Sequence, residues 1–450
     1  MVSMCSALRQ IKDDPFQILQ PAVIESVCDE LDYRWRSGPL SPAHTVALFV
    51  QQVAEGNVPC AEVCHLSDRR FTDSAYCQAR QRLPLELLQE LSRRVAKAVR
   101  TTAARQESLR WHGHRVWIVD GATFSMPDTQ ELQDHFGQPR GQESGCGFPV
   151  GHLLALFDRN SGLMEEPVVS PLYTADLNHT PLLHARMDTG DVLLGDDSFS
   201  SWGHFALVLR AGLHLTTPSH HKRIVSFKPH RPHAKEGRNA VAGRPRSRWI
   251  GSLGTLDQLV EWFKPQACPR WMKREDYDAL PESILVREIR RTIRRKGFRT
   301  ITVTVVTTLL DPQLYPADEL VELRMSRWGV ETDLRHLKTT MKMEVLHCKS
   351  VDGVKKEVAV FVLVYNLVRT LMLEAAARQK VPPGRISFAD ALHWLKHAGP
   401  EDALPTLVVT PDRPGRVEPR VLKRRPKPYD LMNRPRDVLR KALRRRKKPA

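Results

Sequence analysis

Cysteine is scarce in this 450-residue chain, and its spacing fits neither a disulfide framework nor a zinc site. The eight cysteines include no C-x-x-C pair, and the close pair Cys60 and Cys64 has no second pair to complete a zinc site. We therefore expect free thiols in a reducing cytoplasm. A chain of this length, with 41% hydrophobic residues, can bury one large core or two to three ordinary ones without crosslinks.

Long apolar runs are also missing. The N-terminus carries Asp13 and Asp14 instead of a signal-type apolar segment, and no stretch approaches the length of an uncharged membrane span. We therefore expect no signal peptide, no membrane span and a cytoplasmic location. General disorder is excluded too, because nine Trp, fourteen Phe and runs of Leu and Val supply material for a packed core.

The net charge of +17 is concentrated in three segments. Residues 221–250 carry +8, residues 286–299 carry +6 and residues 416–450 carry +12, so the rest of the chain is acidic at −9. Charge scattered for solubility would not cluster in this way, and the pattern favours a polyanion such as nucleic acid lying along defined surfaces. A solvated tail and ordinary surface loops would explain the last segment better than the first two.

Residues 1–108 are predicted to be helical. Pro42 marks the start of one helix, and residues 83–99 form a Leu-rich periodic run. Between them lies a short helix that Thr72 or Asp73 can cap. Polar residues suited to base contacts would line its surface: Gln78, Arg80, Gln81 and Arg82. The region could be a helix-turn-helix DNA reader, but it has no net charge, and a helical scaffold stays the alternative.

The pattern changes from residue 109 onward. Short apolar runs at 116–119 and 192–194 are typical of buried strands, and two further runs flank the turn-rich residues 158–162 as in a hairpin. Helix-like stretches follow near 182–187 and 205–209. The order strand, hairpin, helix, strand, helix predicts a mixed α/β layer over 109–200 with carboxylates at its strand ends.

Residues 201–309 are interpreted as a β-rich basic insertion that decorates this α/β domain. Residues 218–275 show little periodicity, whereas residues 283–310 alternate around a cationic turn and predict a β-hairpin. The second part of the core is expected over 310–375, with helices at 318–343 and 358–373. A helical region and a basic tail would fill residues 376–450.

The predicted helix around Glu331 is the most informative segment. At about 100° per residue, four cations fall within about 40° of Glu331 on the helical wheel. These cations are Arg324, Arg327, Arg335 and Lys338, and beside them lies an apolar stripe of Leu323, Val330, Leu334, Leu337 and Met341. A surface ion-pair ladder is the ordinary explanation, but it would usually contain more acids. The excess of bases indicates phosphates as the missing anions.

Two further carboxylates, Asp120 and Asp196, each end a short apolar strand. Taken singly, such an Asp is most often a cap or turn residue. Phosphoryl transfer on a nucleic acid, however, uses two Mg²⁺ ions about 3.5–4 Å apart, and Mg²⁺ needs only a few oxygen ligands from the protein. Together with the basic Glu331 helix, the two aspartates predict a carboxylate metal site.

Three segments, in order, resemble the insertion sequence 4 family of DDE transposases, whose signature is Y-x2-R-x3-E-x6-K. Arg327, Glu331 and Lys338 match this signature at full spacing, and Arg324 stands where the family has Tyr. Residues 119–128 resemble the first-Asp segment of the family. Residues 193–199 resemble the second, where Asp197 replaces the basic residue that commonly follows Asp196. The resemblance covers roughly residues 40–430.

The resemblance implies an α/β fold: a ribonuclease-H-like catalytic core with a β-rich insertion, a helical N-terminal domain that binds DNA ends, and a basic C-terminal tail. Asp120, Asp196 and Glu331 would be the catalytic residues and would bind two Mg²⁺ ions, with Mn²⁺ as a substitute. The signature Arg and Lys would hold DNA phosphates. The hairpin cations would follow the end DNA: Arg294, Arg295 and Lys296.

The implied activity is cut-and-paste transposition. The protein would bind terminal inverted repeats of double-stranded DNA, hydrolyse the transposon ends to free 3′-OH groups and join these to target DNA, as a homodimer associated with the nucleoid. Two alternatives stay open. A decayed relic would bind ends without metal and never cut, and a Mg²⁺-dependent nuclease on the same core would cut without joining.

Overall fold

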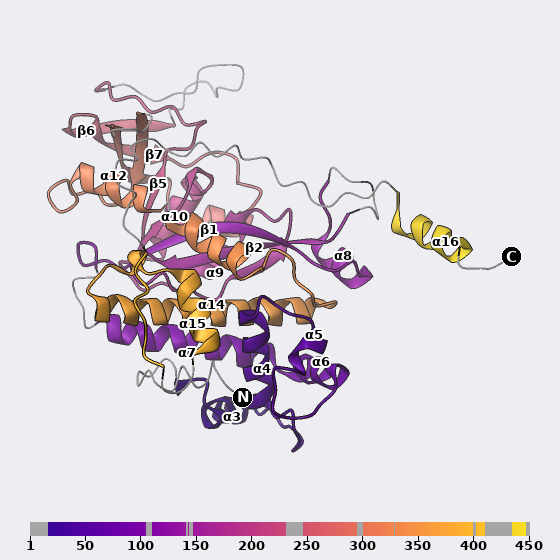
Figure 1. Ribbon diagram of the computed structural model, residues 1–450. Coiled ribbons are helices and arrows are strands. Elements are labelled where there is room, and N and C mark those ends of the chain that lie inside the picture. Colours follow the sequence, from indigo (N-terminus) through magenta and orange to yellow (C-terminus); the bar gives the residue numbers. More distant parts are fainter. Residues whose placement is uncertain are drawn as a thin grey trace.

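The computed structural model describes residues 17–104, 110–140, 143, 147–230, 246–294, 300–327, 329–398, 402–409 and 434–446. Within these ranges the chain forms a mixed α/β protein built on a nine-stranded sheet, with helices packed on both faces (Figure 1). The predicted α/β class is therefore confirmed.

The N-terminal region is helical, as predicted. Its elements are α3 (Pro21–Glu30), α4 (Pro42–Ala54), α5 (Cys60–Val63), α6 (Asp73–Arg82) and α7 (Leu85–Ala104). The Ser41 side chain accepts a hydrogen bond from the His44 N–H at the start of α4, and Thr72 does the same for Ala75 at the start of α6. These caps satisfy backbone donors that a helix leaves unpaired in its first turn.

The sheet has the strand order β3-β2-β1-β4-β5-β9-β8-β7-β6. The strands are β1 (Val116–Ser125), β2 (Val150–Asp158), β3 (Val168–Pro171), β4 (Val192–Leu194), β5 (His214–Pro218), β6 (Ser247–Gly254), β7 (Asp257–Phe263), β8 (Ser283–Ile293) and β9 (Ile301–Thr307). Strands β1, β4 and β5 are parallel, and the remaining pairs are antiparallel. One continuous sheet thus contains both the first strands and the later β-rich segment.

Alternating side chains of the strands supply two separate cores. On β1, Ile118 and Phe124 join a large core with α7 and α14 (Val351–Gln379), while Trp117 and Val119 join a second core on the opposite face. Helices α7 and α14 lie side by side beneath the sheet in Figure 1. The second core contains α9 (Thr180–His184), α10 (Trp202–Arg210) and α11 (Arg274–Asp278).

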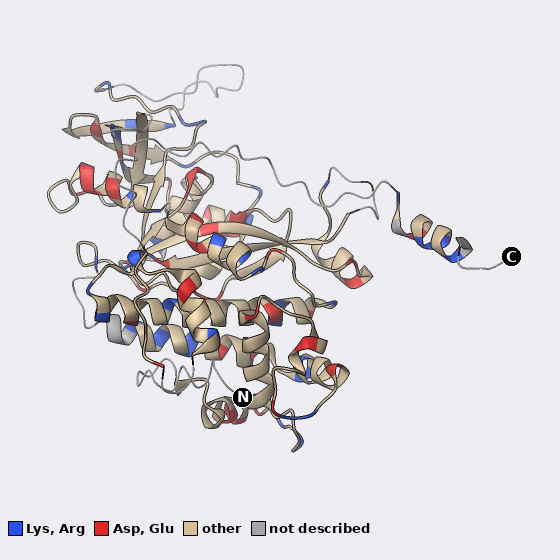
Figure 2. Ribbon diagram, viewed as in Figure 1, with Lys and Arg blue, Asp and Glu red and all other residues tan. Residues whose placement is uncertain are grey.

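The remaining helices are α8 (Gln130–Phe136), α12 (Ala317–Ser326), α13 (Gly329–Arg335), α15 (Phe388–His397) and α16 (Arg436–Arg446). Helix α16 lies away from the sheet, and Figure 2 shows Lys and Arg along its length. The tail between residues 410 and 433 lies outside the described residues.

Helix α14 is long and apolar enough to cross a membrane by length and composition alone. In this structure 89% of its apolar window is buried inside the protein. It therefore serves as the central helix of the large core. The free thiols expected from the sequence are present within the described ranges: Cys28, Cys60, Cys64, Cys77, Cys268 and Cys348.

Three details of the predicted fold are wrong. Residues 218–275, which show little periodicity in the sequence, contain the hairpin of β6 and β7, and β6 has two irregularities of register. The single helix predicted over 318–343 is divided at Gly329, a weak helix former, and continues as a π-helical turn at His336–Thr340.

The third error concerns Arg80, which was expected on the surface of α6. Its side chain is buried, donates to Gln52 and to the Cys348 Sγ atom, and lies 3.9 Å over the centre of the Phe49 ring. Sequence spacing could not show this, because the partners come from α4 and from a segment 268 residues away. Arg80 therefore joins the N-terminal helices to the core.

Candidate active site

Asp120 is placed by the middle of β1, next to the glycine that follows it. The Gly121 N–H donates to one carboxylate oxygen at 2.9 Å, and the Arg327 guanidinium lies 3.2 Å from the other. Both side chains are largely shielded from solvent, with 19% of Asp120 and 9% of Arg327 exposed. The Asp120 carboxylate is thus held in a fixed position on an interior strand of the sheet.

Asp196 follows the end of β4, which is the parallel neighbour of β1. The paired residues of this ladder end at Ile118 and Leu194, two positions before Asp120 and Asp196, and the charge of Asp196 acts on Asp120. Asp196 accepts hydrogen bonds from the Ser198 N–H and hydroxyl, which fix its side chain. Asp197 instead lies 3.3 Å from His221. The register therefore favours Asp196 over Asp197 as the partner of Asp120.

Glu331 comes from the first turn of α13 and is exposed. Burial raises the pKa of Asp120, and the negative charges of Asp196 and Glu331 raise it further, while Arg327 and the Gly121 N–H lower it. The charges of Asp196 and Glu331 are therefore near enough to affect the Asp120 carboxyl group. The three predicted carboxylates come from separate parts of the chain: β1, the segment after β4, and α13.

The three carboxylates suit a hard divalent cation in their chemistry, since Mg²⁺ and Mn²⁺ prefer oxygen ligands. Their mutual repulsion is what a cation between them would relieve. Within the described residues, however, no three His, Cys, Asp or Glu side chains are gathered as a metal-binding group. The guanidinium of Arg327 supplies the positive charge beside Asp120 in this arrangement.

The four predicted cations do not form one column, because the helix is divided. Arg327 is buried against Asp120, and Arg324 is half-buried next to it, with its pKa lowered by burial and by the charge of Arg327. Arg335 is exposed and donates to Thr332, and Lys338 lies in the π-helical turn. The apolar stripe predicted beside them is buried throughout: Leu323, Val330, Leu334, Leu337 and Met341.

Helix α13 is held in position from behind by α14. Arg369 of α14 lies 3.4 Å from Asp333, two residues beyond Glu331, and also donates to the Ser161 carbonyl. The guanidinium passes directly over Gly162, where φ is +69° and a side chain would collide with it. The turn after β2, the core helix and the Glu331 helix are thereby locked together.

The cationic hairpin of β8 and β9 contributes less than its charge suggested. Arg294 is exposed at the end of β8, and Arg295 and Lys296 lie outside the described residues. Arg287 is fully buried and forms a bidentate pair with Asp257 at 2.6 and 2.8 Å. Arg287 therefore has a structural role in the hairpin, and DNA contact by Arg294, Arg295 and Lys296 stays a prediction.

Sequence reasoning missed a second polar pair beside the site. His152 of β2 lies 3.3 Å from Asp176, and a Cβ atom added to Gly121 would meet the His152 ring nitrogen at 2.7 Å. Burial raises the pKa of Asp176, as does the charge of Asp196, whereas His152 lowers it. The signal in the sequence was a single His in an otherwise apolar strand.

Comparison with known proteins gives the family of the chain. A family model described as a transposase DDE domain matches residues 111–367. The transposase InsG of insertion sequence element IS4 from Escherichia coli (strain K12) is 26% identical over 376 residues, which cover 79% of this chain and 77% of that protein. A solved cryo-EM structure, the piggyBac transposase synaptic complex with hairpin DNA, covers 88% of this chain with 9% identity and a TM-score of 0.41, and 80% of that chain is matched. The family match spans more than half of the chain, from the residues before β1 into α14, and the chain therefore belongs to the transposase DDE domain family.

Proposed function

We propose that this protein is a DNA transposase of the insertion sequence 4 type that cuts transposon ends and joins them to target DNA. The observation that carries the proposal is the match of residues 111–367 to a transposase DDE domain, supported by the effect of the charges of Asp196 and Glu331 on the buried Asp120. We assign β1 to β5 and the helices on them to a ribonuclease-H-like core, and the strands β6 to β9 to the basic insertion.

DDE transposases use divalent metal ions, and here the ligands would be Asp120, Asp196 and Glu331. Bound Mg²⁺ would supply Lewis-acid activation of the phosphate and of the attacking oxygen. The chain's own contribution is orientation. The Gly121 N–H and the Ser198 hydroxyl hold two of the carboxylates, and the Asp333–Arg369 contact holds the helix of the third.

The arginines of the site support a phosphate substrate. The Nε atoms of Arg324 and Arg327 are buried and have no hydrogen-bond partner among the described residues. A buried guanidinium donor without a partner is costly, and a backbone phosphate would satisfy it with a charge-assisted bond. We therefore assign these two arginines to the phosphate next to the cleaved bond, with Arg335, Lys338 and Arg294 as outer contacts.

The N-terminal helices are assigned to recognition of the transposon ends. Helix α6 follows the short helix α5 and exposes Gln78, Gln81 and Arg82, while Arg80 anchors the helix from its buried side. Gln and Arg are side chains that read base edges in the major groove. The paired ends would be held by two copies of the chain.

The deciding experiment incubates the protein with linear DNA that carries its terminal inverted repeats, in Mg²⁺ or Mn²⁺. We expect end cleavage and joined products, and we expect Asp120→Asn and Glu331→Gln each to lower the cleavage rate by at least about a thousand-fold. Asp197→Asn is the matched control and should retain most activity, because this side chain contacts His221.

The outcomes separate the alternatives. Cleavage without any joined product would favour a nuclease on the same core. Metal-independent binding of the ends without cleavage would favour a decayed relic. If both carboxylate variants cut as fast as the parent protein, the assigned residues are wrong.

A further inference from the structure

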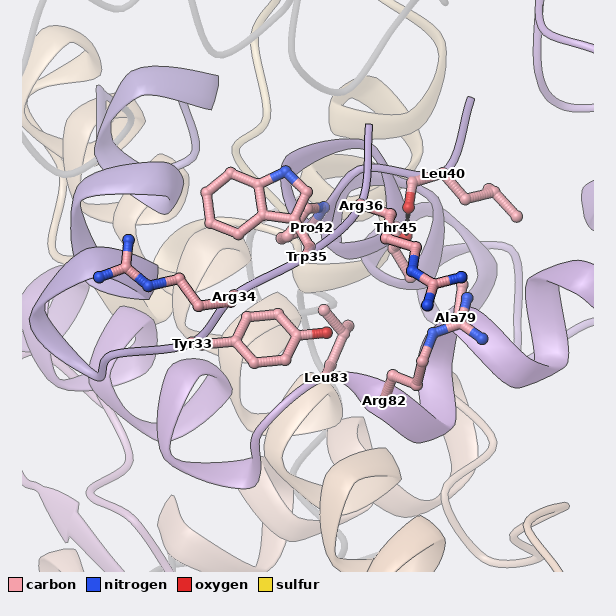
Figure 3. A pocket seen from close by; sticks show the side chains of 10 residues that line it. All are labelled: Tyr33, Arg34, Trp35, Arg36, Leu40, Pro42, Thr45, Ala79, Arg82 and Leu83. Atoms are coloured by element: carbon pink, nitrogen blue, oxygen red, sulfur yellow. Dashed lines mark hydrogen bonds between the residues drawn. The ribbon is translucent and has the colours of Figure 1, made fainter. Parts of the chain in front are cut away.

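A cavity in the N-terminal region lies between the segment that follows α3 and the end of α6. Its volume is about 460 Å³, and Figure 3 shows the side chains around it. The chain from Tyr33 to Arg36 forms one wall, and Arg82 and Leu83 form the opposite one. The cavity lies outside the carboxylate site, and nothing in the proposed chemistry uses it.

Two guanidinium groups meet at one end of this cavity. Figure 3 shows the side chains of Arg36 and Arg82 converging from opposite walls, and both residues are exposed. Within the described part of the chain, neither has an acidic side chain at ion-pair distance, and the cavity lining contains no acid. Two like charges brought together repel each other, so an anion between them would be bound favourably.

Arg34 differs from these two arginines although it is their neighbour. Its side chain points away from the converging pair in Figure 3 and lies 3.1 Å from Asp32, with both groups largely in solvent. The same short segment therefore holds one arginine that is already paired and one that is not. A substitution of Arg34 therefore serves as a control for substitutions of Arg36 and Arg82, because it removes the same charge.

Two aromatic rings also line the cavity. Tyr33 and Trp35 are stacked with ring centres 6.3 Å apart and planes 25° from parallel, and both are only partly buried against the large core. Single-stranded nucleic acid sites combine such aromatic rings, on which unpaired bases stack, with cations that bind the backbone.

We infer that this cavity binds one unpaired nucleotide of a DNA strand, with its phosphate between Arg36 and Arg82 and its base on Trp35. The inference rests on the proposed DNA function, and it adds a subsite that is separate from the carboxylates. The cavity volume suits a ligand of this size. Because Arg82 belongs to the exposed end of α6, a nucleotide held here would lie beside the surface assigned to end recognition.

The test measures binding of a fluorescent short oligothymidylate to the full chain by anisotropy, in EDTA so that no cleavage occurs. We expect Arg36→Gln and Arg82→Gln each to weaken binding about tenfold and to lower the slope of log affinity against log salt by about 0.7, the value for one phosphate contact in a single strand. Arg34→Gln removes the same charge and should change the affinity by less than about twofold.

The base contact is tested separately. Trp35→Ala should weaken binding by between about 5-fold and 100-fold, and Trp35→Phe should restore most of it, since stacking of one base contributes about 1–3 kcal/mol. An oligonucleotide of abasic sites should bind the parent protein as weakly as the thymidylate binds the Trp35→Ala variant. Thermal melting of each variant confirms that it is folded.

Two results would overturn the inference. Arg34→Gln could weaken binding as much as Arg36→Gln, which would mean diffuse attraction, or the abasic strand could bind as well as the thymidylate, which would mean that no base is held. Neither result affects the cleavage experiment with Asp120→Asn. The nucleotide site and the proposed transposase activity can therefore fail independently.

Discussion

The β8–β9 hairpin and the residues around α6 show opposite uses of arginine. The hairpin segment is strongly basic in sequence, yet Arg287 is buried against Asp257, Arg291 pairs with Asp318, and Arg290 donates to Thr304. The N-terminal region has no net charge, yet Arg36 and Arg82 converge without an acidic partner among the described residues.

The difference shows that local charge density is a poor guide to the surface that receives an anion. An arginine is available for a ligand only when the fold has not already given its guanidinium a partner. In the hairpin, cross-strand neighbours and the loop before α12 take up the donors. Around α6, Arg36 and Arg82 are exposed and have no acidic partner among the described residues, so both guanidinium groups remain accessible.

The largest effect is expected where an arginine serves the fold. Arg287→Leu should destabilise the protein by about 3–5 kcal/mol, because it leaves the Asp257 carboxylate buried without a partner. The measurement is chemical denaturation. Arg291→Gln is the control and should cost less than about 1 kcal/mol, since Asp318 is exposed. A double change of Asp257 and Arg287 to Leu should regain most of the loss; an equally unstable double variant would contradict this explanation.

Arg327 is buried like Arg287, but it pairs with Asp120 of the proposed carboxylate site. Its substitution should therefore affect cleavage. Arg327→Gln should lower single-turnover cleavage of end DNA by about a hundred-fold, through loss of phosphate and Asp120 contacts. Arg335→Gln should lower it by less than tenfold, since that side chain is exposed. Equal rates for Arg327→Gln and the parent protein would remove Arg327 from the site.

Two buried histidines, His184 and His204, show what happens when a basic side chain is buried without an acidic partner among the described residues. His184 and His204 lie with their Nε2 atoms 3.1 Å apart, and the His204 Nδ1–H donates to the Phe199 carbonyl. Burial lowers the pKa of His184 to about 3 and that of His204 to about 4. Both rings are therefore uncharged at neutral pH, whereas Arg287 has an acidic partner in Asp257.

The free energy of unfolding should consequently decrease as the pH falls. Each histidine takes up a proton near pH 6.5 in the unfolded chain but not in the folded protein. The stabilisation from the two uncharged histidines is therefore complete above pH 6.5 and is lost as the pH falls toward 4. We expect a loss of about 2 kcal/mol for each histidine between pH 7 and pH 5, measured by denaturation at several pH values. The double variant His184→Gln, His204→Gln should flatten this dependence, and exposed His135→Gln should not. An unchanged slope in the double variant would contradict the assignment.

The sequence allowed the elements with strong local signals to be predicted. Pro42 with Ser41 marked α4, the apolar run at 116–119 marked β1, and the stripe beside Glu331 identified its buried face. Asp120 and Asp196 were found because each follows a short apolar run, and Glu331 was found because four cations share its side of the predicted helix. The structure adds that β1 and β4 are parallel neighbours and that the charges of Asp196 and Glu331 act on Asp120.

Features that depend on distant partners could not be predicted in this way. Arg80 and Arg287 look like surface cations in sequence, and only their contacts with Cys348 and Asp257 bury them. His152 of β2 meets Asp176 of a 3-10 turn, and the cavity at Trp35 forms where the chain after α3 passes the end of α6. Local periodicity contains no information about such pairings, because the partners are separated by long stretches of chain.

Helix α14 connects the N-terminal helices to α13 at a fixed distance. Glu357, in its first half, accepts hydrogen bonds from Asn57 of the N-terminal region and from the backbone at Cys348, whereas Arg369, further along, holds α13 through Asp333. Twelve residues of helix separate the two contacts, a rise of about 18 Å. One stiff helix thus sets the spacing between the N-terminal helices and α13, which carries Glu331. On the proposed function, in which the N-terminal helices recognise the transposon ends, this helix would fix the number of base pairs between the recognised sequence and the cleaved bond.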